Sequence, residues 1–467
     1  MFSLKPSLFS WRSATIAGVA LATVFGSATA HANPFETTLK NGMKVIVKED
    51  RRAPSVVHMV WYRAGSMDEQ DGVSGIAHLL EHMMFKGTKK VGPGEFNKLV
   101  AAAGGRDNAF TSRDYTAYFQ QIPPERLGEM MELEADRMAN LIISDDEFKR
   151  ELEVVKEERR LRTDDQPQSL VYEQLMATAF QSHPYRRPVI GWMADLEGMR
   201  PDDARNWYQT WYSPNNAYLV VTGDVDHTEV FRQAEKHYGK IVARPLPARR
   251  IPAEPVQWGP RSTTVKAPAE LPSVVLAWPV PSVDPDPNKA SNREAYALDV
   301  LASILSGYDG ARLNRNLVRD TQIALSADAG YDGIGRGPSL FYLTATPSPG
   351  HTIEAVETAL RQELHRIQNE GIHADELNRV KTQAIAAQIY RRDSLMGQAM
   401  EIGMLESANF SWRDEQRLLD GLRNVTAEDV QAVAQRYFGN EHLSRAQLDP
   451  LPLNPAKPRA TLSLPHD

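Results

Sequence analysis

The chain has 467 residues, of which 42% are hydrophobic and 24% are charged. This length exceeds what one hydrophobic core normally serves, so the composition predicts a globular protein with two or more domains. The formal net charge of −7 argues against a nucleic-acid ligand, and the lack of cysteine excludes disulfides, thiol catalysis and cysteine-bound metals.

The first 32 residues have the pattern of a cleavable secretory signal peptide. Lys5 and Arg12 precede an apolar run over residues 14–25, and the small-x-small triplet Ala30-His31-Ala32 follows. The apolar run is shorter than the roughly 20 residues that a membrane-spanning helix needs. We therefore expect cleavage after Ala32, a periplasmic location and no stable membrane insertion. An uncleaved N-terminal anchor is the alternative.

A hairpin and a buried strand are expected next. Residues 38–48 contain the tight-turn pair Asn41-Gly42, followed by the alternating residues Val45 and Val47. Residues 55–62 form an apolar stretch that is typical of a strand. A polar, turn-rich segment then leads to a helix that begins near residue 75.

This helix carries the pattern His-x-x-Glu-His at His78, Glu81 and His82. Residues three and four apart share one face of a helix, so the two imidazoles and the carboxylate project together. Two neutral imidazoles at this spacing can hold one Zn²⁺, and the glutamate between them is then placed to transfer a proton. The alternative is a pair of core histidines with satisfied hydrogen bonds, and the rest of the chain must decide between the two.

A glycine turn, a strand and a helix are predicted over residues 102–141. Gly104-Gly105 opens the segment and has the composition of a plain loop, and residues 115–121 have strand character. Leucine and methionine then recur at helical spacing over residues 124–141. Such a stripe is typical of a core rather than of a cofactor site.

A second informative helix is predicted over residues 144–162. Ser144 is a candidate N-cap with Glu147 three residues later, which is the pattern of a capping box. The buried stripe at spacings of four and three residues consists of Phe148, Leu152 and Val155. The adjoining stripe, which we expect to point into the protein, consists of Glu151, Val154, Glu158 and Leu161.

A catalytic zinc ion needs a third protein ligand and an open fourth position. A carboxylate of the 144–162 helix is the natural source, and Glu158 is favoured over Glu157 because it lies on the inward stripe. A surface salt bridge is the alternative role for Glu158.

The sequence predicts an internal duplication around a proline-rich segment. Prolines recur between residues 245 and 260 and predict a linker over 241–262. We therefore expect a signal peptide over 1–32, an N-terminal metal-binding domain over 33–240, a C-terminal homologous inactive domain over 263–450 and a tail over 451–467. The pairs of segments that resemble each other are 201–216 with 427–442, and 55–62 with 273–279. The helix expected over 298–305, where the first pattern should recur, has no histidine pair.

Taken together, these segments resemble the M16 (pitrilysin/insulinase) family of zinc metallopeptidases, in particular its bacterial processing-peptidase-like M16B branch. The resemblance rests on His78-x-x-Glu81-His82, on Glu151 and Glu158 seven residues apart, and on Asn108-Ala-Phe-Thr111. It covers nearly the whole chain after the expected cleavage site. It implies an α+β fold in which two homologous α/β-sandwich halves are joined by the linker into a clam-shell.

The resemblance also implies roles for individual residues. His78, His82 and Glu158 would bind one Zn²⁺ per chain, and Glu81 would be the general base of an endopeptidase that hydrolyses peptides or unfolded segments. Glu151 would assist catalysis by orienting a ligand of the metal.

Two further residues are implied in substrate binding. Asn108 and Ala109 match the edge strand on which members of the family lay the backbone of a peptide substrate. The alternative role for Asn108 is turn formation beside the glycine pair.

One departure from the family concerns the second half. Catalytic members have an Arg and, seven residues later, a Tyr that polarise the substrate carbonyl, but Val318 and Leu325 stand at these positions. Arg319 is one residue out of register, and Tyr331 lies twelve residues beyond it. We therefore expect the chain to be the zinc-bearing subunit of a heterodimer whose homologous partner supplies the Arg/Tyr pair. A homodimer is the second possibility, and a non-catalytic chaperone or assembly subunit that retains the fold is the alternative function.

Overall fold

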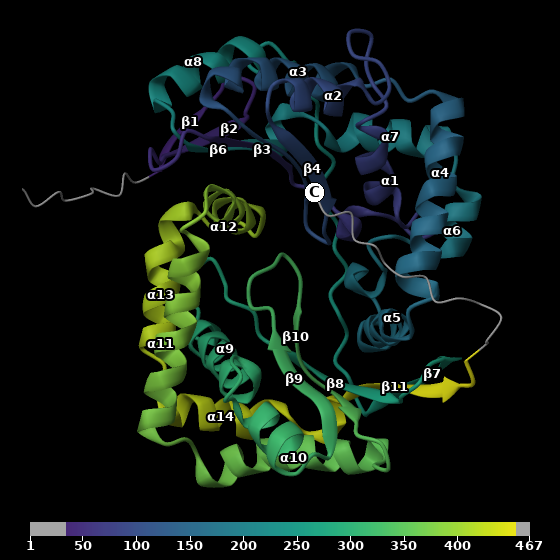
Figure 1. Ribbon diagram of the computed structural model, residues 1–467, viewed down its shortest axis with the longest axis vertical. Coiled ribbons are helices and arrows are strands. Elements are labelled where there is room, and N and C mark those ends of the chain that lie inside the picture. Colours follow the sequence, from purple (N-terminus) through teal and green to yellow (C-terminus); the bar gives the residue numbers. More distant parts are fainter. Residues whose placement is uncertain (1–33, 454–467) are drawn as a thin grey trace, which may run out of the picture. The chain divides into compact units, whose positions relative to one another are not determined.

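The computed structural model describes residues 34–453, which fold into two α+β halves (Figure 1). The predicted signal peptide and most of the predicted tail lie outside the described residues. The strands of the first half are β1 (Phe35–Thr38), β2 (Lys44–Glu49), β3 (Val56–Tyr62), β4 (Arg106–Thr111), β5 (Thr116–Ile122) and β6 (Ala217–Gly223). Its helices are α1 (Ile76–Met83), α2 (Glu95–Ala102), α3 (Leu127–Asn140), α4 (Asp145–Arg159), α5 (Pro167–Ala179), α6 (Met193–Gly198), α7 (Pro201–Trp211) and α8 (His227–His237).

The second half begins after a segment that contains neither helix nor strand between α8 and residue 261. Its strands are β7 (Arg261–Pro268), β8 (Ser273–Val280), β9 (Ala324–Tyr331), β10 (Ser339–Pro347) and β11 (Ser444–Leu451). Its helices are α9 (Ser291–Ser306), α10 (Ile353–Glu370), α11 (Ala374–Arg391), α12 (Leu395–Ser407), α13 (Glu415–Arg423) and α14 (Ala427–Tyr437). The last residues of the predicted linker, 261–262, are therefore the first residues of β7.

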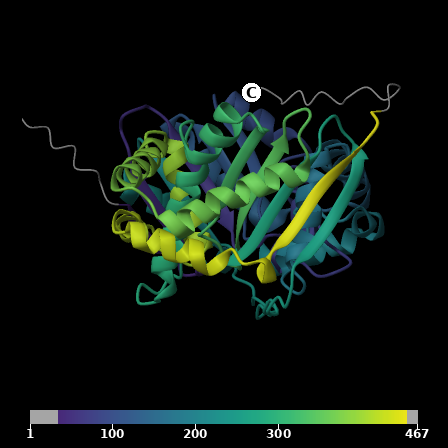
Figure 2. The same ribbon diagram turned by 90° about the horizontal axis from the view of Figure 1, so that it is seen from below.

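The two sheets have the same topology. Their strand orders are β1-β2-β6-β3-β5-β4 and β7-β11-β8-β10-β9. We set β1 aside and number the other five strands of each half in the order in which they occur along the chain. Across each sheet, the spatial order is then first, fifth, second, fourth, third. The first and fifth strands pair in parallel in each half, and the other pairs are antiparallel. Figure 2 shows the parallel pair of the second half, with the yellow strand β11 beside the teal strand β7.

The segments that resemble each other in sequence occupy equivalent places in the two halves. With β1 again set aside, β3 and β8 are the second strands of their halves along the chain. Helix α1 is the first α-helix after β3, and α9 is the first after β8. Helices α7 and α14 each precede the fifth strand. The predicted hairpin is also present, since β1 and β2 pair antiparallel around Gly42, which has a φ of 88°. The prediction of two homologous α+β halves is confirmed.

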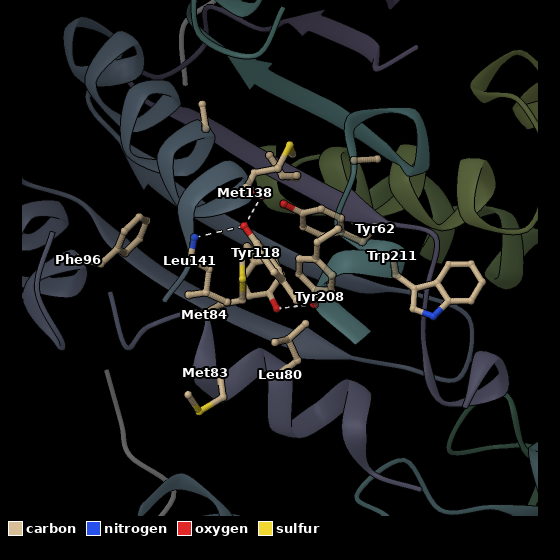
Figure 3. Packing of buried hydrophobic residues seen from close by; sticks show 14 of the residues in the cluster. Tyr62, Leu80, Met83, Met84, Phe96, Tyr118, Met138, Leu141, Tyr208 and Trp211 are labelled. Carbon is tan, nitrogen blue, oxygen red and sulfur yellow. Dashed lines mark hydrogen bonds between the residues drawn. The ribbon is translucent and has the colours of Figure 1, made fainter. Parts of the chain in front are cut away.

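A buried core lies between α1, α3, α7 and the first sheet (Figure 3). Leu80 and Met83 of α1 pack into the cluster that contains Tyr118 and Tyr208. The Tyr208 hydroxyl donates to the carbonyl of Met138 at 2.7 Å, and it accepts the N–H of Leu141 at 3.2 Å. Because these bonds satisfy the hydroxyl, the ring can be buried without leaving an unpaired polar group.

The two halves exchange one helix each. Helix α5 belongs to the first half by sequence, but Val171 and Leu175 pack against strands β7, β8 and β11 of the second sheet. Helix α12 belongs to the second half, but Ala399 and Ile402 pack against β2, β3, β5 and β6 of the first sheet. Figure 1 shows both helices beside the sheets of the opposite halves. Burial of these apolar faces is therefore shared between the halves, which predicts that they fold and unfold together.

We expect Gly403→Leu in α12 to lower the free energy of unfolding by about 1–3 kcal/mol, because the position has no room for a side chain. A Cβ atom at Gly403 would lie 2.0 Å from Cε2 of the fully buried Trp61. Denaturation in urea measures the change. Gly198→Leu is the matched control, since a Cβ atom at Gly198 meets nothing within 4 Å. Equal stability of the two variants would contradict the packing of α12 on the first sheet.

Candidate metal centre and active site

The start of α1 is held by backbone contacts that only glycine permits and by one buried acid. Gly75 has a φ of 89°, and a Cβ atom there would lie 2.5 Å from the carbonyl oxygen of Ile190. The Glu69 carboxylate accepts the N–H groups of Gly75 at 3.0 Å and of Ala77 at 2.9 Å. Burial raises the pKa of Glu69 to about 8, although the two N–H groups lower it. These contacts satisfy donors that a helix N-terminus leaves unpaired and fix the helix in place.

Helix α4 forms as the sequence predicts, with one difference at its N-terminus. The Ser144 hydroxyl accepts the N–H of Glu147 at 3.3 Å, but the Glu147 carboxylate pairs with Arg150 instead of completing a capping box. The predicted apolar stripe is buried and consists of Phe148, Leu152 and Val155.

Three predicted metal ligands converge between α1 and α4. Oε2 of Glu158 lies 3.3 Å from Nε2 of His82 and 3.7 Å from Nε2 of His78. One ligand atom from each of the three residues lies within 4.8 Å of the others. Glu157, the candidate that the sequence disfavoured, has a 62% exposed side chain and pairs with Arg160. Among residues 34–453, this is the one group of such side chains with a geometry able to hold a metal ion.

The donor set fits zinc. Imidazole nitrogens and a carboxylate oxygen are ordinary zinc ligands, and three protein ligands are typical of a catalytic rather than a structural site. Nδ1 of His78 is buried and has no hydrogen-bond partner, so no contact fixes the ring in another role. The fourth position would open towards a groove.

Glu151 lies behind His82 and does not line that groove. Its Oε2 accepts a hydrogen bond from Nδ1 of His82 at 3.3 Å, and its Oε1 lies 2.6 Å from Nζ of Lys86. A carboxylate on the far nitrogen of a metal-binding histidine fixes the orientation of the ring and its tautomer. The geometry therefore suits a positioning role for Glu151.

The two histidines differ in protonation when no metal is present. Burial lowers the pKa of His78 to about 4. Burial also lowers the pKa of His82. The hydrogen bonds with Glu151 and Glu158 have a larger total effect than burial and raise this pKa to about 9. At neutral pH, His78 is therefore ready to bind a cation, whereas His82 must first release a proton.

Glu81 occupies the same face of α1 and is bound by a residue of β4. The hydroxyl of Thr111 donates to Oε2 of Glu81 at 2.5 Å. Burial raises the pKa of Glu81 above its usual value, and the bond from Thr111 lowers it in part. A carboxylate whose pKa lies closer to neutrality is suited to accept and return a proton.

These side chains open on a cavity of about 890 Å³, which we call the His78 groove. Its lining residues are His78, Glu81, His82, Asn108, Ala109, Phe110, Thr111, Glu153, Val154, Glu157, Glu158, Leu161 and Arg162. Strand β4 lies at the edge of its sheet and pairs only with β5 among the described strands, so Asn108 and Ala109 lie beside the groove on a free edge. The Asn108 side chain accepts the N–H of Ala109 at 2.8 Å.

The second stripe of α4, which was expected to point into the protein, does so only in part. Val154 and Leu161 are 48% and 43% exposed. They share the face of Glu158, but that face borders the open groove rather than the core. The helix also ends at Arg159, and a π-helical turn over Arg160–Asp164 follows it.

Sequence reasoning missed several residues that contact the site. Arg162 pairs with Oε1 of Glu158 at 2.6 Å, and its position four residues after Glu158 on a predicted helix was an available signal. Thr111 belongs to the motif Asn108-Ala-Phe-Thr111 and Lys86 follows α1 directly, but the spacing of neither residue indicates its contact with Glu81 or Glu151. Glu69 reaches the N-terminus of α1 from the segment before it.

Comparison with known proteins identifies the family. A family model described as Insulinase (Peptidase family M16) matches residues 44–192, and one described as Peptidase M16 inactive domain matches residues 199–384. The zinc protease PqqE of Helicobacter pylori is 32% identical over 422 residues, which cover 88% of this chain and 92% of that protein. The chain belongs to the M16 peptidase family.

Other proteins are similar in sequence or in fold. An uncharacterized zinc protease of Mycobacterium leprae is 28% identical over 91% of this chain and 93% of its own length. The crystal structure of a protease from Helicobacter pylori has a TM-score of 0.83 and 31% identity, and covers 90% of this chain and all of that one. The first half of the periplasmic protease PqqL from Escherichia coli shares the fold, with a TM-score of 0.74, 20% identity and coverage of 91% of this chain and 94% of that one.

The second half contributes no residue to the His78 groove among the described residues. Val318 packs against the core of the second half, and Leu325 is 50% exposed on β9. The Tyr331 hydroxyl donates to the carbonyl of Pro281 at 2.6 Å. Within residues 34–453, no helix is long and apolar enough to cross a membrane.

We expect zinc binding at pH 7 to release about one proton from the protein, because His82 is protonated below a pKa of about 9 and a zinc ligand must be neutral. Affinity should therefore rise about tenfold for each pH unit between the pKa values of the two histidines. Calorimetry in two buffers of different ionisation enthalpy measures the proton count.

Glu151→Gln should reduce the number of protons released on zinc binding, since the substitution removes a carboxylate that raises the pKa of His82. Glu147→Gln on the same helix is the control, because Glu147 pairs with Arg150. Zinc binding to the unchanged chain at pH 7 without proton release would contradict the assignment of His82 as a ligand.

Proposed function

We propose that this M16 protein is an exported zinc endopeptidase that hydrolyses peptides or unfolded segments. The observation that carries the proposal is the convergence of His78, His82 and Glu158 beside Glu81 in a groove that a free strand edge borders. The proposal of export is supported by the signal-peptide pattern of the first 32 residues and by the similar fold of the periplasmic protease PqqL from Escherichia coli.

His78, His82 and Glu158 would hold one zinc ion per chain. When bound, zinc supplies a Lewis acid that polarises a carbonyl oxygen and makes water acidic enough to be deprotonated near neutral pH. Glu151 keeps the His82 ring in the orientation that points Nε2 at Glu158. Lys86 in turn holds the Glu151 carboxylate.

Glu81 would transfer the protons. Its carboxylate takes a proton from the attacking water and later gives it to the leaving amine. Thr111 fixes the carboxylate through Oε2, and Glu81 lines the groove. The raised pKa of Glu81 makes both proton transfers feasible at neutral pH.

The substrate would bind as an added strand on β4. The edge of β4 offers N–H and C=O groups next to Asn108 and Ala109, and an extended peptide can satisfy them by β-augmentation. A segment can pair in this way only if its backbone is extended and its N–H and C=O groups are free. This requirement supports peptides and unfolded segments as the substrate class.

A homologous partner would complete the site. No cationic or phenolic side chain of the described second half lines the groove, so the oxyanion of the tetrahedral intermediate lacks the donors that other M16 peptidases supply. We infer a heterodimer in which a second M16 subunit provides an Arg/Tyr pair, with a homodimer as the other arrangement. A non-catalytic assembly subunit is the second candidate function, and Val318 and Leu325 at the Arg/Tyr positions favour it.

We expect Glu81→Gln to retain zinc and to lose nearly all hydrolysis, since the amide keeps the shape of the side chain but accepts no proton. Elemental analysis measures the zinc, and cleavage of an unstructured fluorogenic peptide measures the activity. Glu129→Gln on α3 is the control, because Glu129 pairs with Arg126 on the surface. Loss of zinc, or full activity of Glu81→Gln, would contradict the role of Glu81.

Adding the homologous partner to the purified chain should raise the cleavage rate by about 100- to 1,000-fold, which is the typical contribution of one oxyanion donor. The same fluorogenic peptide serves as substrate, and the partner alone is the control. Strong turnover by the chain alone, unchanged by the partner, would rule out the divided site. Zinc binding without cleavage in any combination would favour the assembly subunit.

A further inference from the structure

A second cavity, of about 310 Å³, begins where strand β4 ends. We call it the Tyr172 cavity. It is lined by the turn after β4 over residues 111–114, by helix α5, and by the β9–β10 loop together with the start of β10. Both halves of the chain therefore contribute to its walls.

The cavity adjoins the His78 groove at Thr111. This residue lines both of them, and its hydroxyl binds the carboxylate of Glu81. A peptide that pairs with β4 and continues past Thr111 therefore leads towards the Tyr172 cavity. An extended chain advances about 3.3 Å per residue, so the first side chains beyond the strand end belong to residues close to the bond that Glu81 addresses.

Exposed aromatic rings face the cavity from both halves. Tyr172 on α5 is 47% exposed, and Tyr342 on β10 is 37% exposed. Val189, Ile334 and Leu340, which are half-buried, provide an apolar surface in the same cavity. Aromatic rings that are left half uncovered beside apolar side chains gain contact area when another ring packs on them.

A guanidinium group completes the aromatic wall. Nη2 of Arg113 donates to the Tyr172 hydroxyl at 2.8 Å. The guanidinium carbon lies 5.9 Å from the ring centre of Tyr172 and 5.2 Å from that of Tyr185. A ring that enters the cavity can stack on this planar cation as well as on the tyrosines.

The walls are held in place before any ligand binds. The Tyr185 hydroxyl donates to Asp114 at 2.6 Å and accepts the N–H of Gly337 in the β9–β10 loop at 3.0 Å. Arg336 of the same loop pairs with Asp68 at 3.0 Å, and both side chains are buried. A cavity with fixed walls binds its ligand without a cost for ordering them.

Two of the charged groups of the cavity already have partners. Nη2 of Arg113 donates to the Tyr172 hydroxyl, and Asp114 accepts the Tyr185 hydroxyl and the N–H of Arg336. An aromatic ring is the side chain that the exposed tyrosines, the apolar surface and the guanidinium plane accommodate together.

We propose that the Tyr172 cavity is a specificity site that binds an aromatic side chain of the peptide substrate, a few residues from the scissile bond. The inference rests on the proposed peptidase function and adds a substrate preference to it. Because α5 and β10 belong to different halves, an aromatic residue in the cavity contacts both halves of the chain at once.

The test uses a set of unstructured peptides with one phenylalanine moved through successive positions around a fixed cleavage site. The full zinc-loaded chain, with its partner where activity requires it, cleaves each peptide, and mass spectrometry gives the products. We expect phenylalanine at one position to raise kcat/KM about tenfold over alanine, and Tyr172→Ala to abolish this preference. Tyr172→Phe should keep it.

Two further variants make the result specific. Tyr342→Ala should also weaken the preference, because Tyr342 lines the same cavity from β10. Tyr390→Ala, which removes a tyrosine that is 71% exposed on α11 and lines neither cavity, should leave it unchanged. The same preference in Tyr172→Ala as in the unchanged chain, or equal cleavage of leucine and phenylalanine peptides, would overturn the proposal.

A binding assay distinguishes a wrong assignment of the Tyr172 cavity from a wrong assignment of the peptidase function. Fluorescence anisotropy with labelled peptides and the Glu81→Gln variant measures affinity without cleavage. A phenylalanine preference in binding that Tyr172→Ala abolishes supports the cavity assignment even if no peptide is cleaved, in which case the peptidase function alone fails. Absence of any positional preference in binding and in cleavage overturns the cavity assignment.

Discussion

Three ligand atoms from two helices can share one metal ion only if α1 and α4 keep a fixed separation. Arg159, the residue after Glu158, supplies much of this constraint. Its guanidinium is buried and donates to the carbonyl of Gly191 at 2.7 Å. The backbone of Gly191 in turn lies against Gly75 at the start of α1, so close that a Cβ atom at Gly191 would be 2.3 Å from the Ser74 carbonyl. The end of α4 is thus tied to the start of α1 through one loop.

The same arginine connects the metal centre to the contact between the halves. Arg159 pairs with Glu173 through two bonds of 2.8 and 3.0 Å, and Glu173 is buried on α5. Helix α5 packs on the sheet of the second half, which also forms part of the Tyr172 cavity. The candidate metal centre and the Tyr172 cavity are therefore both connected to α5, the first through the pair of Arg159 with Glu173. A buried ion pair at this place costs desolvation, and its paired, two-bond geometry offsets that cost.

Much of this organisation was accessible from the sequence because it depends on local periodicity. The spacing of His78 and His82 places both on one helix face, and the apolar stripe of α4 identifies the side on which Glu158 lies. The repeated strand–helix pattern predicted the two homologous halves. Helical periodicity did not predict the environment of Val154 and Leu161, because that environment depends on long-range packing. Both residues follow the stripe of the helix, but they border a groove, and local sequence does not distinguish a groove from a core.

The contacts that complete the site come from distant segments. Glu69 lies before α1 and folds back onto its N-terminus, and Thr111 reaches Glu81 from a strand. The exchange of α5 and α12 depends on which sheet face remains uncovered after each half has formed, and a single helix sequence does not carry that information. These long-range contacts fix the position of α1 and of the Glu81 carboxylate, which the histidine motif alone does not determine.

Zinc anomalous scattering from crystals of the chain grown with zinc is the most direct test of this account. The account predicts one anomalous peak per chain at the zinc absorption edge, within bonding distance of Nε2 of His78, Nε2 of His82 and Oε2 of Glu158. A peak held by other residues, or no peak between α1 and α4 when zinc is in excess, would contradict it.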